Sequence, residues 1–199
     1  MYRLFYDYHA IGDVLMIVFD NKKKTTRIEK KDNCVALYNG EELIGVNILN
    51  ISQIVRIKAS GMILQPALEF IDVIDHILVN AGLESLPKQT SSGFVVAQIL
   101  ESIPDVDGKH STVKIDLGRR VIYARANFPI IPLTAMVVVA LPGTILFNGE
   151  TVEVAQIDGV FFEGYLCSKK DIDHREGKPD ELYLLEEFIE IGQDFFAKE

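Results

Sequence analysis

LPGTILFNGETVEVAQIDGVFFEGYLCSKKDI, residues 141–172, is the stretch of this sequence that says most about the fold. The Asn-Gly pair at 148–149 is the strongest hairpin signal in the chain, because both residue types tolerate the positive φ angles of a two-residue turn. Gly159 and Gly164 bracket large and acidic side chains and allow one strand to approach another closely. Residues 168–170, Ser-Lys-Lys, follow at once. The stretch therefore predicts a hairpin and then a closely packed strand with a polar exit.

The sequence before this stretch, from residue 94 onward, also consists of short apolar runs separated by turn residues. The expected strands are FVVAQILES (94–102), HSTVKIDLG (110–118), RRVIYARAN (119–127) and MVVVAL (136–141). Five or so strands within about 75 residues are typical of a small closed or partly closed barrel.

The first half of the chain has a different pattern. Its expected strands are RLFYDY (3–8), VLMIVF (14–19), CVALYN (34–39) and LIGVNIL (43–49). A helix is expected from Pro66, which is tolerated in a first turn, to a stop at Gly82. Its apolar face should comprise Ala67, Leu68, Ile71, Ile74, Leu78 and Ala81.

The stretch LPKQTSSG, residues 86–93, has the proline, serine and glycine content of a linker. We therefore expect an α+β N-terminal domain at residues 1–88 and an all-β barrel with a C-terminal extension at 93–199. The apolar tail of that extension exceeds what a small barrel needs, and we expect it to pack on the first domain or on a second subunit. Its members are Leu182, Leu184, Leu185, Phe188, Ile189, Ile191, Phe195 and Phe196.

Composition sets limits on location and partners. The 199 residues are 48% hydrophobic and 25% charged, which is typical of a globular protein. No apolar run reaches the roughly 18 residues of a membrane-spanning helix, and the N-terminus lacks the apolar core of a signal peptide. The two distant cysteines, Cys34 and Cys167, favour a reducing cytoplasm, and no membrane partner is expected. Residues 90–199 carry ten Lys or Arg against eighteen Asp or Glu, and so hold −8 of the total charge of −9.

Catalytic and metal-binding signals are weak. The four histidines, His9, His76, His110 and His174, form none of the usual zinc spacings, so no metal or cofactor is expected. Lysines 169 and 170 could lower the pKa of the Cys167 thiol, but no histidine is placed to serve it as a base. A small buried thiol is the commoner role for such a cysteine. We expect no catalytic step.

Two basic stretches could contact phosphate. NKKKTTRIEKK, residues 21–31, reads either as a solvated loop between two strands or as a phosphate contact. In the second stretch, alternation along residues 119–127 puts Val121, Tyr123 and Arg125 on one face of a strand. An aromatic ring beside a guanidinium is a platform for base stacking and phosphate contact. The alternative is that Tyr123 lies in the core and the arginines cap the rim of a hairpin.

These motifs together resemble a known family. Pro142-Gly143, Gly159-Val160, Gly164 and Ser168 follow the pattern of the EMAP-II-like tRNA-binding OB-fold domain. That domain occurs in free-standing bacterial tRNA-binding proteins and as an appendage of methionyl- and phenylalanyl-tRNA synthetases. A near-neutral first half followed by this module resembles the YtpR-type subgroup. Two positions depart from the pattern: residues 103–109, Ile-Pro-Asp-Val-Asp-Gly-Lys, lack the family's histidine, and Arg125 replaces a small residue.

The resemblance implies a cytoplasmic protein that binds tRNA by shape and backbone through an OB barrel, without catalysis. It also suggests an aminoacyl-tRNA synthetase and a second copy of the chain as further partners. The residues expected to contact tRNA are Lys109, Lys114, Arg119, Arg120, Tyr123, Arg125, Asn127, Ser168, Lys169 and Lys170. The acidic balance keeps one alternative open, a protein-interaction module that retains the barrel without binding RNA. An enzyme that uses Cys167 is the other.

Overall fold

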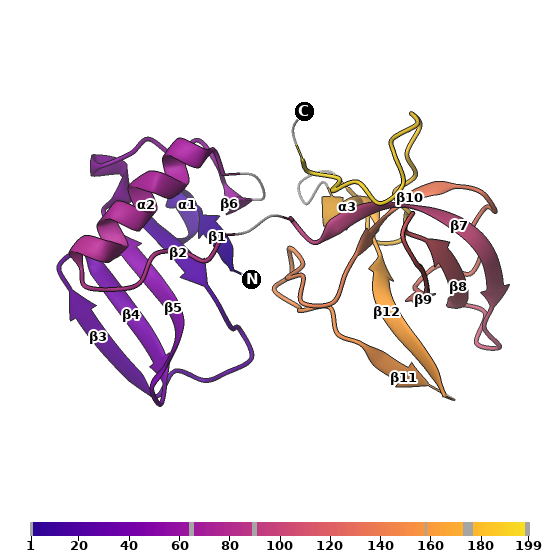
Figure 1. Ribbon diagram of the computed structural model, residues 1–199, viewed down its shortest axis with the longest axis horizontal. Helices are drawn as coiled ribbons and strands as arrows, with labels where there is room; N and C mark the ends of the chain where they lie inside the picture. The colour runs from indigo at the N-terminus through magenta and orange to yellow at the C-terminus, as the bar shows by residue number, and fades with distance from the viewer. Residues whose placement is uncertain (1, 64–65, 89–90, 158, 173–176, 198–199) are drawn as a thin grey trace. The chain divides into compact units, whose positions relative to one another are not determined.

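The computed structural model of the chain describes residues 2–63, 66–88, 91–157, 159–172 and 177–197 (Figure 1). The chain divides into two compact units, Met1–Thr90 and Ser91–Glu199. The boundary falls inside the linker-like stretch 86–93, of which residues 89 and 90 lie outside the described residues, as does His174. The extent of each unit as a separate domain stays a prediction. No helix of the described residues is long and apolar enough to cross a membrane.

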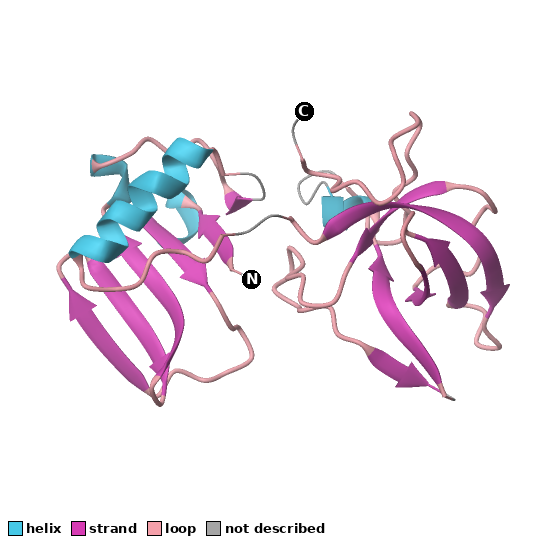
Figure 2. Ribbon diagram, viewed as in Figure 1, coloured by secondary structure: helices cyan, strands magenta, loops and turns pink. Residues whose placement is uncertain are grey.

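The first unit is built on a six-stranded antiparallel sheet in the order β3-β4-β5-β2-β1-β6 (Figure 2). Its strands are β1 Arg3–Tyr6, β2 Val14–Val18, β3 Arg27–Lys31, β4 Cys34–Asn39, β5 Glu42–Leu49 and β6 Gly61–Ile63. Its helices are α1 Tyr8–Ile11, the single-turn η1 Ile51–Gln53 and α2 Leu68–Asn80. All four strands expected from the sequence are present.

Two strands of this sheet were not expected. The basic run 21–31 is expected as a solvated loop or a phosphate contact. Its second half instead forms β3, which pairs with β4 from Arg27 to Lys31. The alternation that marks a half-buried strand is hidden here by charged side chains on both faces, which also protect an edge strand from pairing with other chains. Strand β6 has only three residues and begins at a glycine. It is set by pairing with β1 rather than by a pattern of its own.

Helix α2 lies over one face of this sheet (Figures 1 and 2). Its buried side chains, Ile74, Ile77 and Leu78, join a core with sheet residues such as Leu15 and Ile48. The expected helix is therefore present, but two members of its expected apolar face are exposed. Ala67 lies before the helix, and Leu68 is 80% exposed, because the buried stripe begins a turn later in the helix.

The second unit is a closed barrel of five strands. They follow the order β10-β7-β8-β9-β12, and β10 pairs with β12 to close the ring. The strands are β7 Phe94–Pro104, β8 Ser111–Asp116, β9 Val121–Ala126, β10 Met136–Ala140 and β12 Val160–Leu166, with a short β11 Ala155–Ile157 beside β12 and the single-turn helix α3 Lys169–Ile172. Only the pair β9–β12 is parallel. The expected barrel is confirmed, and its topology is consistent with an OB-fold.

Close approach of β12 to the barrel interior depends on Gly164. A Cβ atom built there would lie 2.8 Å from Ile122 Cδ1 and 2.8 Å from Val139 Cγ1. Both neighbours belong to the barrel core. Gly164 thus serves the predicted close packing, whereas the same prediction is wrong for Gly159, which has φ +82° and open space around its Cβ position.

The expected Asn-Gly turn also forms. The Gly149 N–H donates to the Leu146 carbonyl at 2.9 Å, and the Leu146 N–H donates to the Glu150 carbonyl at 2.7 Å. The arms around the turn do not form regular strands. Beyond the turn they are joined by the isolated bridge between Ile145 and Thr151 and by two hydrogen bonds, from the Gly143 N–H to the Val152 carbonyl and from the Val152 N–H to the Thr144 carbonyl, both at 2.8 Å.

The C-terminal tail packs on the barrel of its own chain, which corrects the expectation that it packs elsewhere. Strand β8 pairs with β7 only from Gln98 onward, and the tail takes the edge that is left. There the Val96 N–H donates to the Gln193 carbonyl and the Phe195 N–H to the Phe94 carbonyl, at 2.9 and 2.8 Å. The rings of Phe94 and Phe196 meet edge to face with centroids 5.3 Å apart.

The same tail fills a second gap, on β10. Strand β12 reaches only Val139 and Ala140, and the Leu185 N–H donates to the Met136 carbonyl at 2.9 Å where β12 is absent. Of the apolar tail, Phe188 is 84% exposed. The tail therefore supplies missing backbone partners to two barrel strands.

Gly118 and Gly192 mark the place where the tail crosses the β8–β9 turn. Gly118 has φ +79°, and a Cβ there would lie 2.7 Å from the Ile191 carbonyl oxygen.

We predict that Gly118→Ala lowers the free energy of unfolding by about 2–4 kcal/mol, because the alanine would be strained in the left-handed backbone conformation and its Cβ would clash with the backbone of the tail. Gly143→Ala is the control, because Gly143 has φ +87° and open space around its Cβ position. It should cost only about 1–2 kcal/mol in chemical denaturation. An equal loss of stability in the two variants would show that the tail shifts to accommodate the added methyl group and is not tightly packed at this crossing.

Asp194 fastens the tail to the start of β7. Its carboxylate accepts hydrogen bonds from Ser91 Oγ at 2.7 Å, from Ser92 Oγ at 2.7 Å and from the Phe196 N–H at 3.0 Å. Asp194→Ala should therefore lower the free energy of unfolding by about 2–3 kcal/mol, because it leaves charge-assisted donors unpaired. Glu187→Ala removes an exposed carboxylate from the same tail and should change stability by less than about 0.5 kcal/mol. Thermal or urea unfolding of both variants measures the difference, and a near-neutral Asp194→Ala would contradict the fastening role.

Candidate nucleic-acid interface

The outer face of β8 and β9 carries the residues that could meet a nucleic acid. Along β9, Val121, Tyr123 and Arg125 are exposed, whereas the residues between them are buried in the barrel. Lys114 of β8 lies directly opposite Tyr123, and Thr112 lies opposite Arg125. Tyr123 is 40% exposed, so the alternative that placed this ring in the core is wrong. The structure thus brings a lysine, a tyrosine and an arginine together on one outward face.

Acidic side chains already form ion pairs with Lys114 and Arg120 on this face, and with Arg125 as described below. Lys114 Nζ lies 3.0 Å from Glu101 Oε1, a contact that raises the pKa of the lysine. Arg120 Nη1 lies 3.4 Å from Glu163 Oε1. A polyanion that approaches this face would have to displace carboxylates from their partners. Sequence reasoning missed these pairs, because each partner comes from a strand distant in the sequence.

Arg125 is held by the loop that joins β7 to β8. Its Nη2 lies 3.2 Å from Asp105 Oδ2 and 3.6 Å from Asp107 Oδ2. Asp107 also accepts the backbone N–H of Lys109 at 2.8 Å and that of His110 at 3.0 Å. The pKa of Asp107 is held well below its usual range, first by the Lys109 N–H and then by contacts with His110. The loop in which the sequence departs from the resembled family therefore presents a fixed negative charge beside Arg125.

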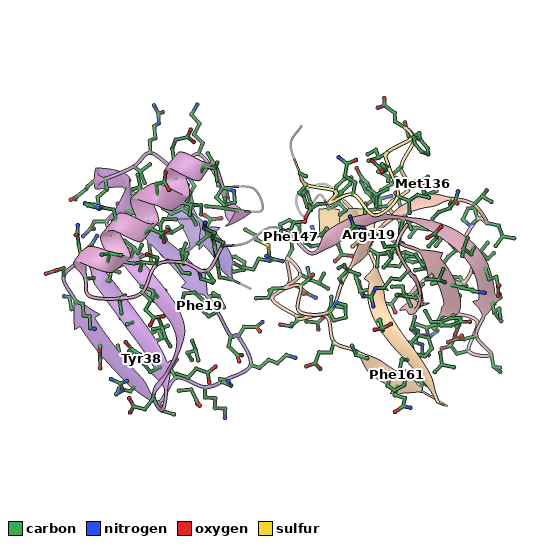
Figure 3. All side chains as sticks on the ribbon, in the orientation of Figure 1. Phe19, Tyr38, Arg119, Met136, Phe147 and Phe161 are labelled. Atoms are coloured by element: carbon green, nitrogen blue, oxygen red, sulfur yellow. The ribbon has the colours of Figure 1, made fainter. Side chains whose placement is uncertain are left out.

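Two cations of the barrel have no ion pair within the described residues. Lys109 precedes β8 and Arg119 follows it, so they are exposed at opposite ends of that strand. Figure 3 labels Arg119 on the barrel. Asn127 is also exposed, directly after β9. These three expected contacts are therefore accessible to a ligand.

The end of β12 differs from expectation at Ser168. This residue is 3% exposed, and its hydroxyl donates to Asp171 Oδ2 at 2.6 Å while its N–H donates to the same oxygen at 2.8 Å. Ser168 caps α3 in the interior and does not present a polar exit. A serine followed three residues later by an acid is a helix-start signal, which could have predicted this role.

Lys169 and Lys170 are exposed on α3. Lys169 Nζ lies 2.7 Å from Glu181 Oε2, and Lys178 Nζ lies 2.9 Å from the other oxygen of the same carboxylate. Hydrogen bonds from Lys169 and then Lys178 lower the pKa of Glu181 to about 2. The carboxylate therefore stays charged throughout the neutral range and partly neutralises this cationic segment.

Cys167 is fully buried, and burial raises the pKa of its thiol well above the ordinary value. A buried thiol whose pKa is raised is poorly suited to act as a nucleophile, so the structure at Cys167 gives the enzymatic alternative no support. Among the described residues, no three His, Cys, Asp or Glu side chains gather as a metal site.

Comparison with known proteins gives three significant similarities, and no family model matches the chain. The chain is 29% identical over 198 residues, 96% of its length and 98% of the relative's, to "Putative tRNA-binding protein YtpR" of Bacillus subtilis (strain 168). It is 26% identical over 128 residues to the phenylalanine–tRNA ligase beta subunit of Neisseria meningitidis, which covers 61% of this chain and 16% of the subunit. The corresponding subunit of Thermotoga maritima is 28% identical over 107 residues, 53% of this chain and 14% of the subunit.

The likeness to YtpR thus extends over both units, whereas the ligase subunits share only a small part of much longer chains. The resemblance to YtpR and to phenylalanyl-tRNA synthetases expected from the motifs is confirmed.

Burial of Cys167 leads to a direct test. We predict that Cys167→Ser lowers the free energy of unfolding by about 1–3 kcal/mol, because a hydroxyl replaces a buried thiol without an assured hydrogen-bond partner. Thiol-specific labelling of the native protein, followed residue by residue by mass spectrometry, should be slow at Cys167 and fast only in denaturant. Rapid labelling of the native protein at this position would reopen the nucleophile hypothesis.

Proposed function

We propose that this protein binds tRNA through the outer face of its barrel, recognising shape and backbone rather than sequence. The observation that carries the proposal is the similarity, over 96% of the chain, to a protein named for tRNA binding. The two partial similarities to a tRNA ligase subunit support it. In this proposal the barrel is an OB-fold of the EMAP-II-like type and the first unit is an α+β domain.

The outer face of β8 and β9 suits this role chemically. Tyr123 offers an exposed ring on which a base can stack, beside the Lys114 and Arg125 cations. Lys109 and Arg119 lie at either end of the same strand and can meet phosphates without breaking an existing ion pair. Arg120, Asn127, Lys169 and Lys170 complete the proposed contacts. Ser168 is left out because it is buried.

The paired cations make binding modest and dependent on salt. When tRNA binds, Lys114, Arg120 and Arg125 must each exchange a carboxylate partner for a phosphate. On a solvated surface this exchange contributes little to the free energy of binding. Net affinity then comes mainly from counterion release and stacking. The protein in this proposal has no catalytic step, works in the cytoplasm and has an aminoacyl-tRNA synthetase and a second copy of itself as further partners.

One observation favours a second function. The region 90–199 has a charge of −8, and five of its lysines and arginines already form ion pairs with acids in the described structure. A barrel with this charge distribution is also suited to a protein partner, as an interaction module that does not bind RNA.

Binding of total tRNA measured across salt concentrations separates the two functions. Four to six phosphate contacts predict that log affinity falls with log salt with a slope of about −3 to −5. Arg119→Gln should flatten the slope by about 0.7–0.9, because one counterion-releasing contact is lost. Tyr123→Leu should weaken binding by about 1–3 kcal/mol through lost stacking, while Tyr123→Phe keeps it. Absence of binding at low salt, or a slope of zero, would leave the interaction module.

A matched pair of variants tests the ion-pair exchange itself. Glu163→Gln frees Arg120, whereas Glu187→Gln makes the same charge change on an exposed tail residue without an ion pair in the described structure. Glu163→Gln should strengthen tRNA binding about threefold more than Glu187→Gln. Equal effects would mean that only the overall charge matters and that Arg120 lies off the binding face.

A further inference from the structure

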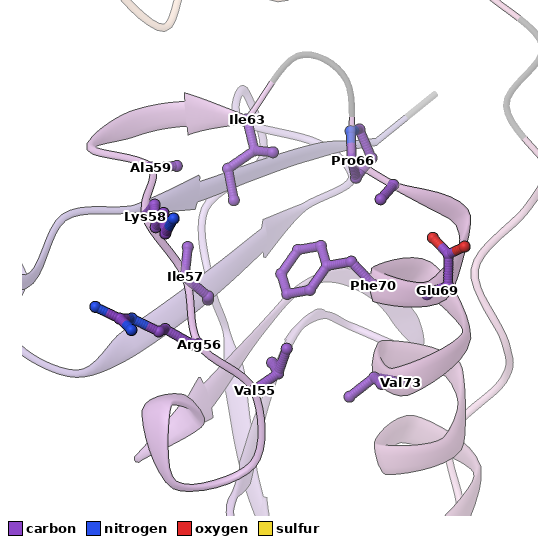
Figure 4. A pocket seen from close by; sticks show the side chains of 11 residues that line it. Val55, Arg56, Ile57, Lys58, Ala59, Ile63, Pro66, Glu69, Phe70 and Val73 are labelled. Atoms are coloured by element: carbon purple, nitrogen blue, oxygen red, sulfur yellow. The ribbon is translucent and has the colours of Figure 1, made fainter.

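The first unit holds a pocket that the proposed function leaves unused. It has a volume of about 420 Å³ and opens between the start of α2, the chain before β6 and β6 itself (Figure 4). Its apolar lining comes from Val55, Ile57, Ile63, Phe70 and Val73, and the Phe70 ring points into it. A volume in this range fits a small organic ligand.

The pocket follows from how the chain reaches the edge of the sheet. From Val55 to Ala59 the backbone runs without pairing in the sheet, and its side chains alternate. Val55 and Ile57 are half-buried toward the pocket, whereas Arg56, which lies between them, and Lys58, which follows them, are exposed. Strand β6 is the last strand at this edge of the sheet, so no further strand of the described residues covers these apolar side chains. An apolar surface is thus left open to solvent beside two cations.

The charges around the pocket are unequal on its two sides. Arg56 and Lys58 have no ion pair within the described part of the chain and stand together on one side. Glu69, in the first turn of α2, stands on the other (Figure 4). The three charges of the lining leave a net excess of one positive charge. The side with Arg56 and Lys58 can therefore bind the anionic group of a ligand whose apolar part occupies the pocket.

We propose that this pocket binds a small amphipathic carboxylate, with its apolar chain against Phe70 and Val73 and its head group beside Arg56 and Lys58. The apolar lining supplies the affinity for the chain, and the unpaired cations select the charge of the head group. A neutral or cationic molecule with the same chain gains the first contribution but lacks the second. The site is separate from the barrel face, so it stands whether or not tRNA binding does.

Octanoate is the probe, with octan-1-ol and octylammonium as head-group controls of the same chain length. Each is titrated into the full-length, isotope-labelled protein while the methyl signals of Val55, Ile57, Ile63 and Val73 are followed by NMR. Octanoate should bind saturably and move these signals, octanol more weakly and octylammonium most weakly. Hexanoate should bind up to about fifteenfold more weakly than octanoate, because two fewer methylenes are buried.

Charge variants give effects of opposite sign. Arg56→Gln and Lys58→Gln should each weaken octanoate binding about threefold, and Glu69→Gln should strengthen it about twofold, as expected for exposed charge pairs. Lys30→Gln is the control, because it removes an exposed cation from β3 at the opposite edge of the sheet. It should leave the affinity for octanoate unchanged, as should Arg119→Gln in the other unit.

A steric variant checks that the pocket itself is the site. Ala59→Phe adds a ring beside Ile63 and should abolish octanoate binding while the NMR spectrum of the barrel stays native (Figure 4). Equal affinity for octylammonium, or signal changes outside the pocket, would overturn the proposal. Sedimentation that shows two copies associating, with Ala59→Phe separating them, would also overturn it in favour of a second chain as the occupant.

Discussion

Backbone pairing at the ends of the barrel strands is the constraint on which the second unit depends. Five strands close into a ring only because β12 fits against β9 on one side and β10 on the other, with Gly164 where a side chain would meet Ile122 and Val139. The ring is not complete along its whole height. Strand β8 begins to pair with β7 only at Gln98, and β12 reaches only the last two residues of β10. Buried N–H and C=O groups left there without partners would be costly, and the C-terminal tail supplies the partners. The tail is thus a structural part of the barrel.

Closure of the barrel also fixes its outer surface. Once Ile122 and Ala124 point inward, Tyr123 and Arg125 must point outward, and β8 brings Lys114 opposite the tyrosine. The same ring places acids from β7, from β12 and from the loop after β7 within reach of these cations. The surface is therefore electrostatically balanced before any ligand arrives. That balance, rather than the number of basic residues, sets how strongly a polyanion can bind.

The exposed strand edges of the two units are covered in different ways, and the two proposed sites differ accordingly. In the barrel the tail covers the open edges with apolar side chains and backbone hydrogen bonds. In the first unit β3 is an edge strand rich in charge, while the edge at β6 leaves an apolar pocket beside Arg56 and Lys58. A charged edge strand such as β3 resists pairing with strands of other chains. An open apolar pocket with cations at its rim can bind a ligand.

The sequence by itself determined the elements that local patterns specify. Alternation located the expected strands, helical spacing located α2, and the glycines at 149 and 164 marked a turn and a close approach. Alternation along β9 placed Tyr123 and Arg125 on the same face, but that this face points outward was decided only by the structure. The tertiary structure alone decided β3 and β6, the burial of Ser168, the course of the tail and the ion pairs of the barrel face. The physical reason is the sequence separation of the residues that make each contact. Strand and helix periodicities reflect contacts within a few residues, whereas Arg120 and Glu163, or Phe94 and Phe195, become neighbours only when the barrel closes.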